Sequence, residues 1–212
     1  MVSSIRDDSG LRAIRLEVAS LKEGKAPLIE KMLARYESNR VRIAEAGFPV
    51  IAFCGHGRSG KDLAAKWLSS TYGVRYVGSV SHAVSPLIAE SLGVSREEAF
   101  ESRHDERMYW FEWCNALRRD DPSLLVKLTL AENDMVAGIR GDTELHTCKA
   151  QGVIDLAIWV DNPRVEKDPT VEFSVDDCDL VIRNAGSKSS YFNRLKLLCD
   201  YFGFKGKEND KN

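Results

Sequence analysis

The feature that most constrains the fold of this chain is a glycine-rich segment, residues 55–62, that stands between an apolar run and a helical pattern. The segment reads GHGRSGKD; PVIAFC (49–54) precedes it and LAAKWL (63–68) follows it. A buried strand, a tight turn and a helix are therefore predicted in this order. Glycines let such a turn adopt positive φ, so that successive N–H groups converge on one anion at the helix N-terminus. The segment predicts a phosphate-binding loop.

The spacing of this segment matches the phosphate-binding pattern G-x-x-x-x-G-K-[ST] at every place except the last. Asp62 stands where the pattern has a hydroxyl that ligates magnesium. Because a carboxylate suits this hard cation, directly or through water, Asp62 is the candidate metal ligand. A glycine-rich turn without a nucleotide is the competing interpretation. The candidate nucleotide-binding residues of the loop are Gly55, Gly57, Arg58, Ser59, Gly60, Lys61 and Asp62.

Composition limits the number of domains, the partners and the compartment that can be expected for this chain. The 212 residues suit one domain with some additional structure. Lysine and arginine number 30 against 32 acidic residues, a formal net charge of −2, so neither a nucleic-acid-coating nor a membrane-adhesive surface is expected. Five cysteines without C-x-x-C spacing favour reduced thiols, and no apolar run is long enough to span a membrane. We expect a cytoplasmic protein without nucleic-acid or membrane partners.

The rest of the chain alternates between helical and strand patterns. Residues 1–47 predict two amphipathic helices, broken near Gly24 and Pro27, that form an N-terminal extension. Packing of this extension on its own chain is favoured over self-association as a homodimer and over contact with another protein. The further expectations are strands at 74–78, 135–139, 153–160 and 179–182, a turn at 79–81, helices from about 82 to 131, at 142–150 and at 191–202, a polar loop or lid at 161–177, and a disordered tail at 205–212.

Three segments resemble the P-loop nucleoside monophosphate kinases, and among these most closely the bacteriophage deoxynucleoside monophosphate kinases. GRSGKD (57–62) resembles the A-R-S-G-K-D loop of the phage group, in which aspartate stands at the same last place. VAGIR (136–140), followed by Glu144, resembles a strand that ends in D-V-R and continues to an N-E pair, with Gly138 in place of the aspartate. DLVIRNAGS (179–187) resembles a D-x-x-I-x-N-x-G-S element shared with dephospho-coenzyme A kinases. The resemblance covers about residues 49–202.

The resemblance implies an α/β, three-layer P-loop nucleotide-kinase fold with a parallel central sheet, a helical insertion that binds the nucleoside monophosphate, and a short lid. The implied organisation is a helical extension at 1–47, a kinase domain at 48–204 and the tail at 205–212. ATP and Mg²⁺ are the implied cofactors, and small nucleotides are the implied substrates. The implied reaction transfers the γ-phosphate of ATP to a (deoxy)nucleoside monophosphate and gives the diphosphate.

Phosphoryl transfer requires donor and acceptor in line and positive charge around the transferred group. The predicted catalytic residues are therefore Lys61, Arg107 and Arg140, the last because it follows the carboxyl end of a strand. Arg164 in the lid is expected to reach the donor phosphates. Arg103, which would share a helix face with Arg107 at i,i+4, and Arg118 and Arg119 are further candidates, although the acids beside them offer ion pairs instead.

Other side chains carry weaker signals. The aromatic residues of 109–113 could wall a nucleobase, but at least two of them are expected in the core. His56 could touch phosphate or face solvent. His82 and His146 have no metal-ligand partner at useful spacing, so no zinc site is expected. Asp134, Asp142 or Asp62 would have to replace the aspartate that is missing at Gly138.

Two other functions remain open. A kinase for a hydroxyl acceptor, such as dephospho-coenzyme A or a nucleoside, needs a carboxylate near the acceptor oxygen, whereas a phosphate acceptor is already ionised and needs arginines. Residues 78–82 contain no acid, which favours the nucleotide acceptor, but Asp62 could serve as a base. The departures at Asp62 and Gly138 also allow a nucleotide-binding module with little turnover.

Overall fold

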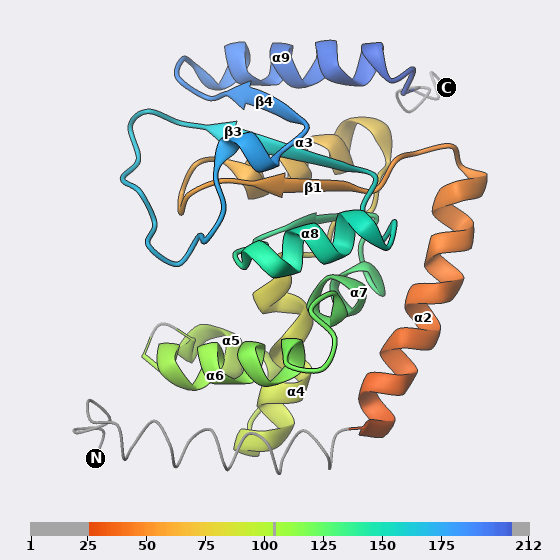
Figure 1. Ribbon diagram of the computed structural model, residues 1–212, viewed down its shortest axis with the longest axis vertical. Coiled ribbons are helices and arrows are strands. Elements are labelled where there is room, and N and C mark those ends of the chain that lie inside the picture. The colour runs from red at the N-terminus through yellow and green to blue at the C-terminus, as the bar shows by residue number, and fades with distance from the viewer. Residues whose placement is uncertain (1–25, 104, 205–212) are drawn as a thin grey trace, which may run out of the picture.

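The chain folds around a parallel four-stranded sheet that helices cover on both faces (Figure 1). The structure is a computed structural model that describes residues 26–103 and 105–204. The strands are β1 (Ile51–Cys54), β2 (Met135–Ala137), β3 (Leu156–Asp161) and β4 (Leu180–Arg183), in the order β2-β1-β3-β4. All neighbouring strands pair in parallel. The expected α/β class and parallel sheet are therefore confirmed.

The two faces of the sheet carry separate hydrophobic clusters, because successive side chains of a strand point to opposite faces. Ile51 and Phe53 of β1 belong to the cluster with α3 (Lys61–Tyr72) and α9 (Lys188–Tyr201). Ala52 and Cys54 belong to a larger cluster on the other face. Its helices are α2 (Ala26–Glu45), α4 (Val80–Leu92), α6 (Arg107–Arg118), α7 (Leu124–Leu130) and α8 (Asp142–Ala150), and α5 (Arg96–Ser102) packs on α4.

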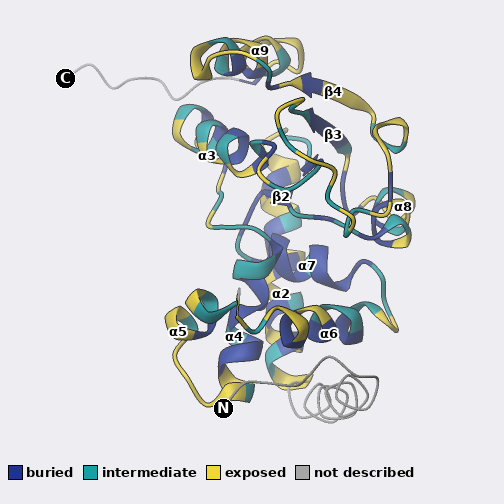
Figure 2. Ribbon diagram, turned by 90° about the vertical axis from the view of Figure 1, so that its left-hand side faces the viewer, coloured by how far each residue is buried: buried dark blue, intermediate teal, exposed yellow. Residues whose placement is uncertain are grey.

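Helix α2 is part of this larger core. Ile29, Met32, Tyr36 and Ile43 are buried along one stripe of the helix, which lies beside α7 (Figures 1 and 2). The Asn39 amide Nδ2 adds hydrogen bonds to the carbonyl oxygens of Leu130 and Asn133, at 2.7 and 2.8 Å. Packing on the same chain is thus confirmed for the second predicted N-terminal helix. The first predicted helix and the 205–212 tail lie outside the described residues.

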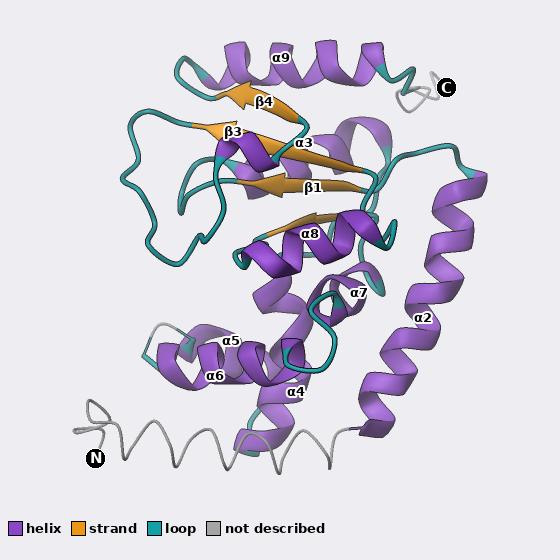
Figure 3. Ribbon diagram, viewed as in Figure 1, coloured by secondary structure: helices purple, strands orange, loops and turns teal. Residues whose placement is uncertain are grey.

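The segment 74–78 is not a strand, contrary to expectation (Figure 3). Side chains take the place of a ladder partner: Asp134 Oδ2 accepts a hydrogen bond from the Arg75 N–H at 2.8 Å, and Asn133 Oδ1 accepts one from the Val77 N–H at 2.6 Å. The predicted turn at 79–81 is instead the start of α4, whose N-cap is Ser79. A serine at this position commonly begins a helix.

The remaining elements agree with expectation except at their ends. Strand β2 stops at Ala137 because Gly138 follows with φ +107°, a conformation outside the extended region. Helix α8 has its predicted bounds, and the predicted lid is a loop at 162–174 that ends in a short 3₁₀ helix, η1 (Val175–Asp177). None of the described helices is long and apolar enough to cross a membrane.

Candidate phosphate-binding site

The glycine-rich segment forms the turn between β1 and α3, as predicted. Gly55 has φ +123° and Gly60 has φ +108°, and both lie against other parts of the chain. A Cβ atom on Gly55 would stand 2.8 Å from the Val160 carbonyl oxygen, and one on Gly60 would stand 2.5 Å from Asn184 Nδ2. Glycine is therefore required at both positions by conformation and by space. The turn lies at the carboxyl ends of β1 and β3, the edge where ligands bind in open parallel sheets.

Backbone N–H groups of the loop are available to a ligand. Among residues 26–103 and 105–204, no acceptor bonds the N–H groups of Gly57, Arg58, Gly60 or Lys61, and no side chain caps α3. Unpaired N–H groups and the positive end of the helix dipole favour an anion at this place. The loop therefore fits the phosphates of a nucleotide.

Lys61 is the buried cation of the loop, in addition to the exposed Arg58. Nζ of Lys61 donates hydrogen bonds to the carbonyl oxygens of Gly55 at 2.8 Å and His56 at 2.5 Å. Burial, and then the positive charge of Arg140, lower the pKa of Lys61 from 10.5 to about 8. The ammonium group is thus charged at neutral pH, although burial and a second cation both oppose the charge.

Loop 162–174 brings Asp168 to the phosphate-binding loop. Arg140 Nη1 donates a hydrogen bond to Asp168 Oδ2 at 2.6 Å and another to Thr170 Oγ1. A Cβ atom on Gly57 would lie 3.2 Å from Asp168 Oδ2. Partial burial acts to raise the pKa of Asp168, but hydrogen bonds from Thr170 and Arg140 outweigh it and hold this pKa well below its usual range. Asp168 was not predicted, because no motif marks it and only the fold brings it here.

His56 and Asn184 fix the loop from its two sides. His56 Nδ1 accepts a hydrogen bond from the Asp168 N–H at 3.3 Å, and its ring packs edge-on against Trp159 with centroids 5.1 Å apart. Asn184 Nδ2 donates to the Ser59 carbonyl oxygen at 2.8 Å. The D-x-x-I-x-N-x-G-S element was the sequence signal for Asn184, although its role as a support of the loop was not predicted.

Arg164 contacts Asn184, which supports the loop. Its Nη2 atom donates to the Asn184 carbonyl oxygen at 3.1 Å, and its Nε atom to Asn162 Oδ1 at 3.3 Å.

Asp62 is exposed at the start of α3, where its Oδ1 accepts a hydrogen bond from the Tyr76 hydroxyl at 2.6 Å. Burial and the charge of Asp62 raise the pKa of Tyr76 well above its usual range, so the hydroxyl keeps its proton. Asp62 therefore presents a carboxylate beside the loop, as a metal ligand requires.

Asp134 cannot replace the aspartate missing at Gly138. It precedes β2, at the opposite end of this strand from Arg140, and pairs with Arg42 and Arg75. Gly138 itself has φ +107°, a conformation that glycine adopts much more easily than aspartate. The backbone conformation after β2 therefore favours glycine at position 138, where the phage kinases that the chain resembles have aspartate.

His146 has carboxylate partners that were not expected. Its Nε2 atom lies 3.3 Å from Asp142 Oδ1, one helical turn away on α8, and 3.4 Å from Asp177 Oδ1. The ligand atoms of these three side chains lie within 4.8 Å of one another, so the group has the chemistry to hold a metal ion. The i,i+4 spacing of Asp142 and His146 was the available sequence signal.

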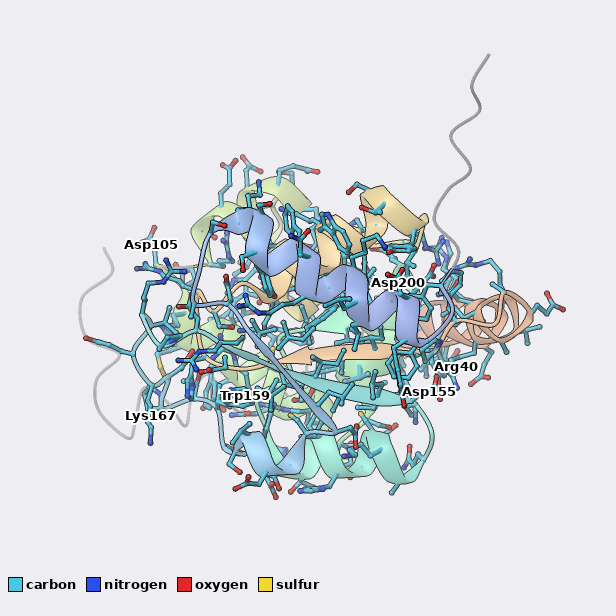
Figure 4. The ribbon with its side chains drawn as sticks, turned by 90° about the horizontal axis from the view of Figure 1, so that it is seen from above. Arg40, Asp105, Asp155, Trp159, Lys167 and Asp200 are labelled. Carbon is cyan, nitrogen blue, oxygen red and sulfur yellow. The ribbon has the colours of Figure 1, made fainter. Side chains whose placement is uncertain are left out.

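The predicted arginines of the insertion do not form one cluster. Arg103 and Arg107 do not share a helix face, because α5 ends at Ser102 and α6 begins only at Arg107. The guanidinium of Arg103 stacks 4.0 Å from the ring centroid of Phe100. Arg107 is exposed, and no described side chain bonds it. Asp105, just before α6, lies on the same side of the molecule as Lys167 of the 162–174 loop (Figure 4).

Arg118 pairs with a buried carboxylate. Its Nη1 atom lies 3.0 Å from Glu144 Oε2, and Glu144 is 3% exposed. Burial raises the pKa of Glu144, although Arg118 and the N–H groups of Arg140 and Gly141 oppose the shift. Within the described residues, Oε1 of Glu144 and the indole nitrogens of Trp110 and Trp113 have no hydrogen-bond partner. Trp110 and Trp113 are buried, which confirms the expectation that at least two of these aromatic residues belong to the core.

No protein-family model matches the chain, and no curated protein matches its sequence. The local motifs and the geometry above are therefore the basis for the function.

Proposed function

We propose that the chain is a P-loop kinase that binds ATP at residues 55–61 and transfers the γ-phosphate to a (deoxy)nucleoside monophosphate. The observation that carries the proposal is the set of unpaired N–H groups at the start of α3, beside the Lys61 ammonium. This combination matches what triphosphate binding requires: many directed donors and a positive charge at one place. The finer fold assignment, a nucleotide-kinase fold with an acceptor-binding insertion and a lid, belongs to the same proposal.

Each residue has a distinct part in this proposal. Lys61 and Arg140 neutralise charge on the donor phosphates, and Arg140 also holds Asp168 and the lid. Asp62 would hold Mg²⁺, which when bound neutralises the charge of the β- and γ-phosphates. Arg164 acts on the loop through Asn184 and contacts the donor only if the lid moves further.

The acceptor is proposed to be a phosphate rather than a hydroxyl. Asp168 is a carboxylate next to the loop, but its lowered pKa and its bond to Arg140 make it a weak proton acceptor. Helix α6 carries Arg107 at its start and Arg118 at its end, and Arg118 pairs with Glu144. These groups offer charge and hydrogen bonds to an acceptor nucleotide.

A second candidate is a nucleotide-binding module with little turnover. The observation that favours it is that groups of the chain itself already occupy the polar partners of the site. Lys61 bonds two loop carbonyl oxygens, and the Asp168 carboxylate lies beside Gly57. ATP would then bind by displacing these contacts. A hydroxyl-acceptor kinase, such as one for dephospho-coenzyme A, rests on the exposed Asp62 alone.

The test is an assay of the full chain with ATP, Mg²⁺ and a panel of acceptors. We expect a nucleoside diphosphate from at least one (deoxy)nucleoside monophosphate and loss of this activity in Lys61→Ala. Lys66→Ala is the matched control, because Lys66 is exposed on the same helix. Activity only with dephospho-coenzyme A or a nucleoside would replace the acceptor assignment, and ATP binding without turnover would favour the binding module. Normal turnover in a folded Lys61→Ala variant would remove the donor assignment.

The proposal places the protein in the cytoplasm with small nucleotides as its partners. All five cysteines are free thiols, as a reducing compartment requires. Self-association through residues 1–47 stays a prediction. The apolar stripe of α2 is already covered by its own chain, so a homodimer would depend on residues 1–25, which lie outside the described part.

A further inference from the structure

A groove of about 800 Å³ lies along one face of α2, and none of its lining residues belongs to the phosphate-binding loop. The residues of α2 that line it recur at helical spacing from Lys31 to Arg42. The opposite wall comes from Arg75 and Val77, which precede α4, from Arg96 at the start of α5, and from the end of α7. A volume of this size is ordinary for a small-molecule site.

The charge of this groove, which we call the α2 groove, is strongly positive. Among the described residues that line it, the basic ones are Lys31, Arg35, Arg42, Arg75 and Arg96, and the acidic one is Glu132. Asp134, buried next to the groove, pairs with Arg42 and Arg75. Five cations thus share two carboxylates, in a chain whose formal net charge is −2.

Two of the arginines, Arg42 and Arg96, are held in place before any ligand binds. Arg42 bonds Asn39 Oδ1 at 2.9 and 3.0 Å in addition to Asp134. Arg96 bonds Ser85 Oγ at 2.8 Å, the His82 carbonyl oxygen at 2.9 Å and Glu132 Oε2 at 3.2 Å. Pre-ordered guanidinium groups lose little further entropy when they bind an anion.

Lys31 and Arg35 complete the groove with charge that no other residue of 26–103 or 105–204 neutralises. Both are exposed, and no ion pair or hydrogen bond joins either side chain to another described residue. Like charges at i,i+4 on a helix repel each other and so favour a bound anion. No aromatic residue in the described part of the chain lines the groove, so a ligand is recognised here through charged oxygens and not by base stacking.

We propose that the α2 groove is a second anion site that binds a polyphosphate-bearing small molecule through its phosphate groups. Arginine binds phosphate oxygens with paired N–H groups, and several arginines, two of them fixed, match a chain of phosphates better than one carboxylate. This site is separate from the donor site and does not depend on the proposed kinase activity.

The test is a calorimetric titration of inorganic tripolyphosphate into the full chain carrying Lys61→Ala, which weakens the donor site. We expect one remaining site whose Kd rises at least about tenfold when Lys31→Glu and Arg35→Glu are added, because attraction becomes repulsion. The matched control adds Lys66→Glu and Lys188→Glu, which change the net charge equally on α3 and α9. Its Kd should change by less than about twofold, since screening weakens distant charges.

Hydrogen exchange then locates the bound tripolyphosphate. We expect new protection in α2 and in residues 75–77, where the wall of the groove lies. Protection confined to residues 55–61, absence of binding, or an equal loss in both variant pairs would overturn the proposal. So would a single-stranded oligonucleotide that binds through Lys31 and Arg35 while tripolyphosphate does not, because the ligand would then be a nucleic acid.

Discussion

At the scale of single residues, the lowered pKa of Lys61 predicts that ATP use at the proposed donor site depends on pH. The ammonium group of the free protein loses its proton as the pH rises through about 8. Because only the charged form attracts ATP, we expect kcat/KM for ATP to fall by about tenfold per pH unit above this value. The measurement is the pH profile of kcat/KM with the best acceptor from the panel.

Lys61→Arg is the control for this profile, since a guanidinium stays protonated throughout the range. If the variant retains activity, its profile should lack the fall near pH 8. The stability of the wild type changes in the opposite direction: between about pH 8 and 10.5 the unfolded chain holds the proton and the native chain does not, so the free energy of unfolding rises there. A wild-type kcat/KM that stays level to pH 10 would contradict the assignment of Lys61.

Two glycines with positive φ separate the energetic cost of a steric clash from the cost of a left-handed backbone. Gly60→Ala places a Cβ atom 2.5 Å from Asn184 Nδ2, whereas Gly152→Ala, at φ +63°, meets nothing within 4 Å. We expect Gly152→Ala to lower the free energy of unfolding by about 1 kcal/mol, the cost of left-handed backbone. Gly60→Ala should cost about 2 kcal/mol more, since it also displaces a buried hydrogen bond. Urea unfolding measures both, and equal losses would mean that Asn184 does not confine Gly60.

At the scale of elements, the contact between Arg140 and Asp168 is one of the bonds that hold the 162–174 loop against the sheet edge. Arg140 follows β2 and Asp168 lies in the 162–174 loop, so their contact fastens the loop to the sheet edge. Arg140→Ala and Asp168→Ala should each speed tryptic cleavage after the exposed Arg164, because the loop opens more often. The double variant should be cut no faster than the more sensitive single variant, since both lose the same bond.

Arg183→Ala is the control for lid opening. Arg183 is an exposed arginine at the end of β4, with its Nε atom 3.8 Å from Asp161 Oδ2 and no contact with Asp168. Its removal should leave the cleavage rate after Arg164 unchanged. Additive effects of Arg140→Ala and Asp168→Ala would show that the two side chains hold the loop separately.

At the scale of the whole molecule, α2 is a structural part of the domain and not a detachable extension. It buries Ile29, Met32, Tyr36 and Ile43 in the larger cluster. Burial of such side chains contributes about 1.5–3 kcal/mol each, and the net stability of a domain is only about 5–15 kcal/mol. A chain that begins at residue 48 should therefore lose cooperative thermal unfolding as followed by circular dichroism.

A chain that begins at residue 26 is the control, because it removes only the part that lies outside the described residues. It should keep a single transition. If the chain that begins at residue 48 unfolded at the same midpoint, α2 would contribute nothing to the core, and the extension would be separate from the α/β domain.

The sequence predicted best what depends on neighbours along the chain. The loop at 55–62, the helix at 142–150 and the parallel strands follow from glycine spacing and apolar periodicity, both of which are local patterns. The segment 74–78 has the same apolar character as a strand, but Asn133 and Asp134 supply its hydrogen-bond partners instead. Such partners are distant in sequence, so no local pattern could reveal them.

The sequence by itself determined the loop that can bind phosphate, because backbone conformation and the position of Lys61 are encoded within eight consecutive residues. Only the tertiary structure decided what surrounds this loop. Asp168 and Asn184 reach it from segments more than a hundred residues away, and Lys31 meets Arg75 and Arg96 in one groove only after α2 has packed. Contacts of this kind depend on how the helices cover the sheet, and that is settled by the burial of the whole core.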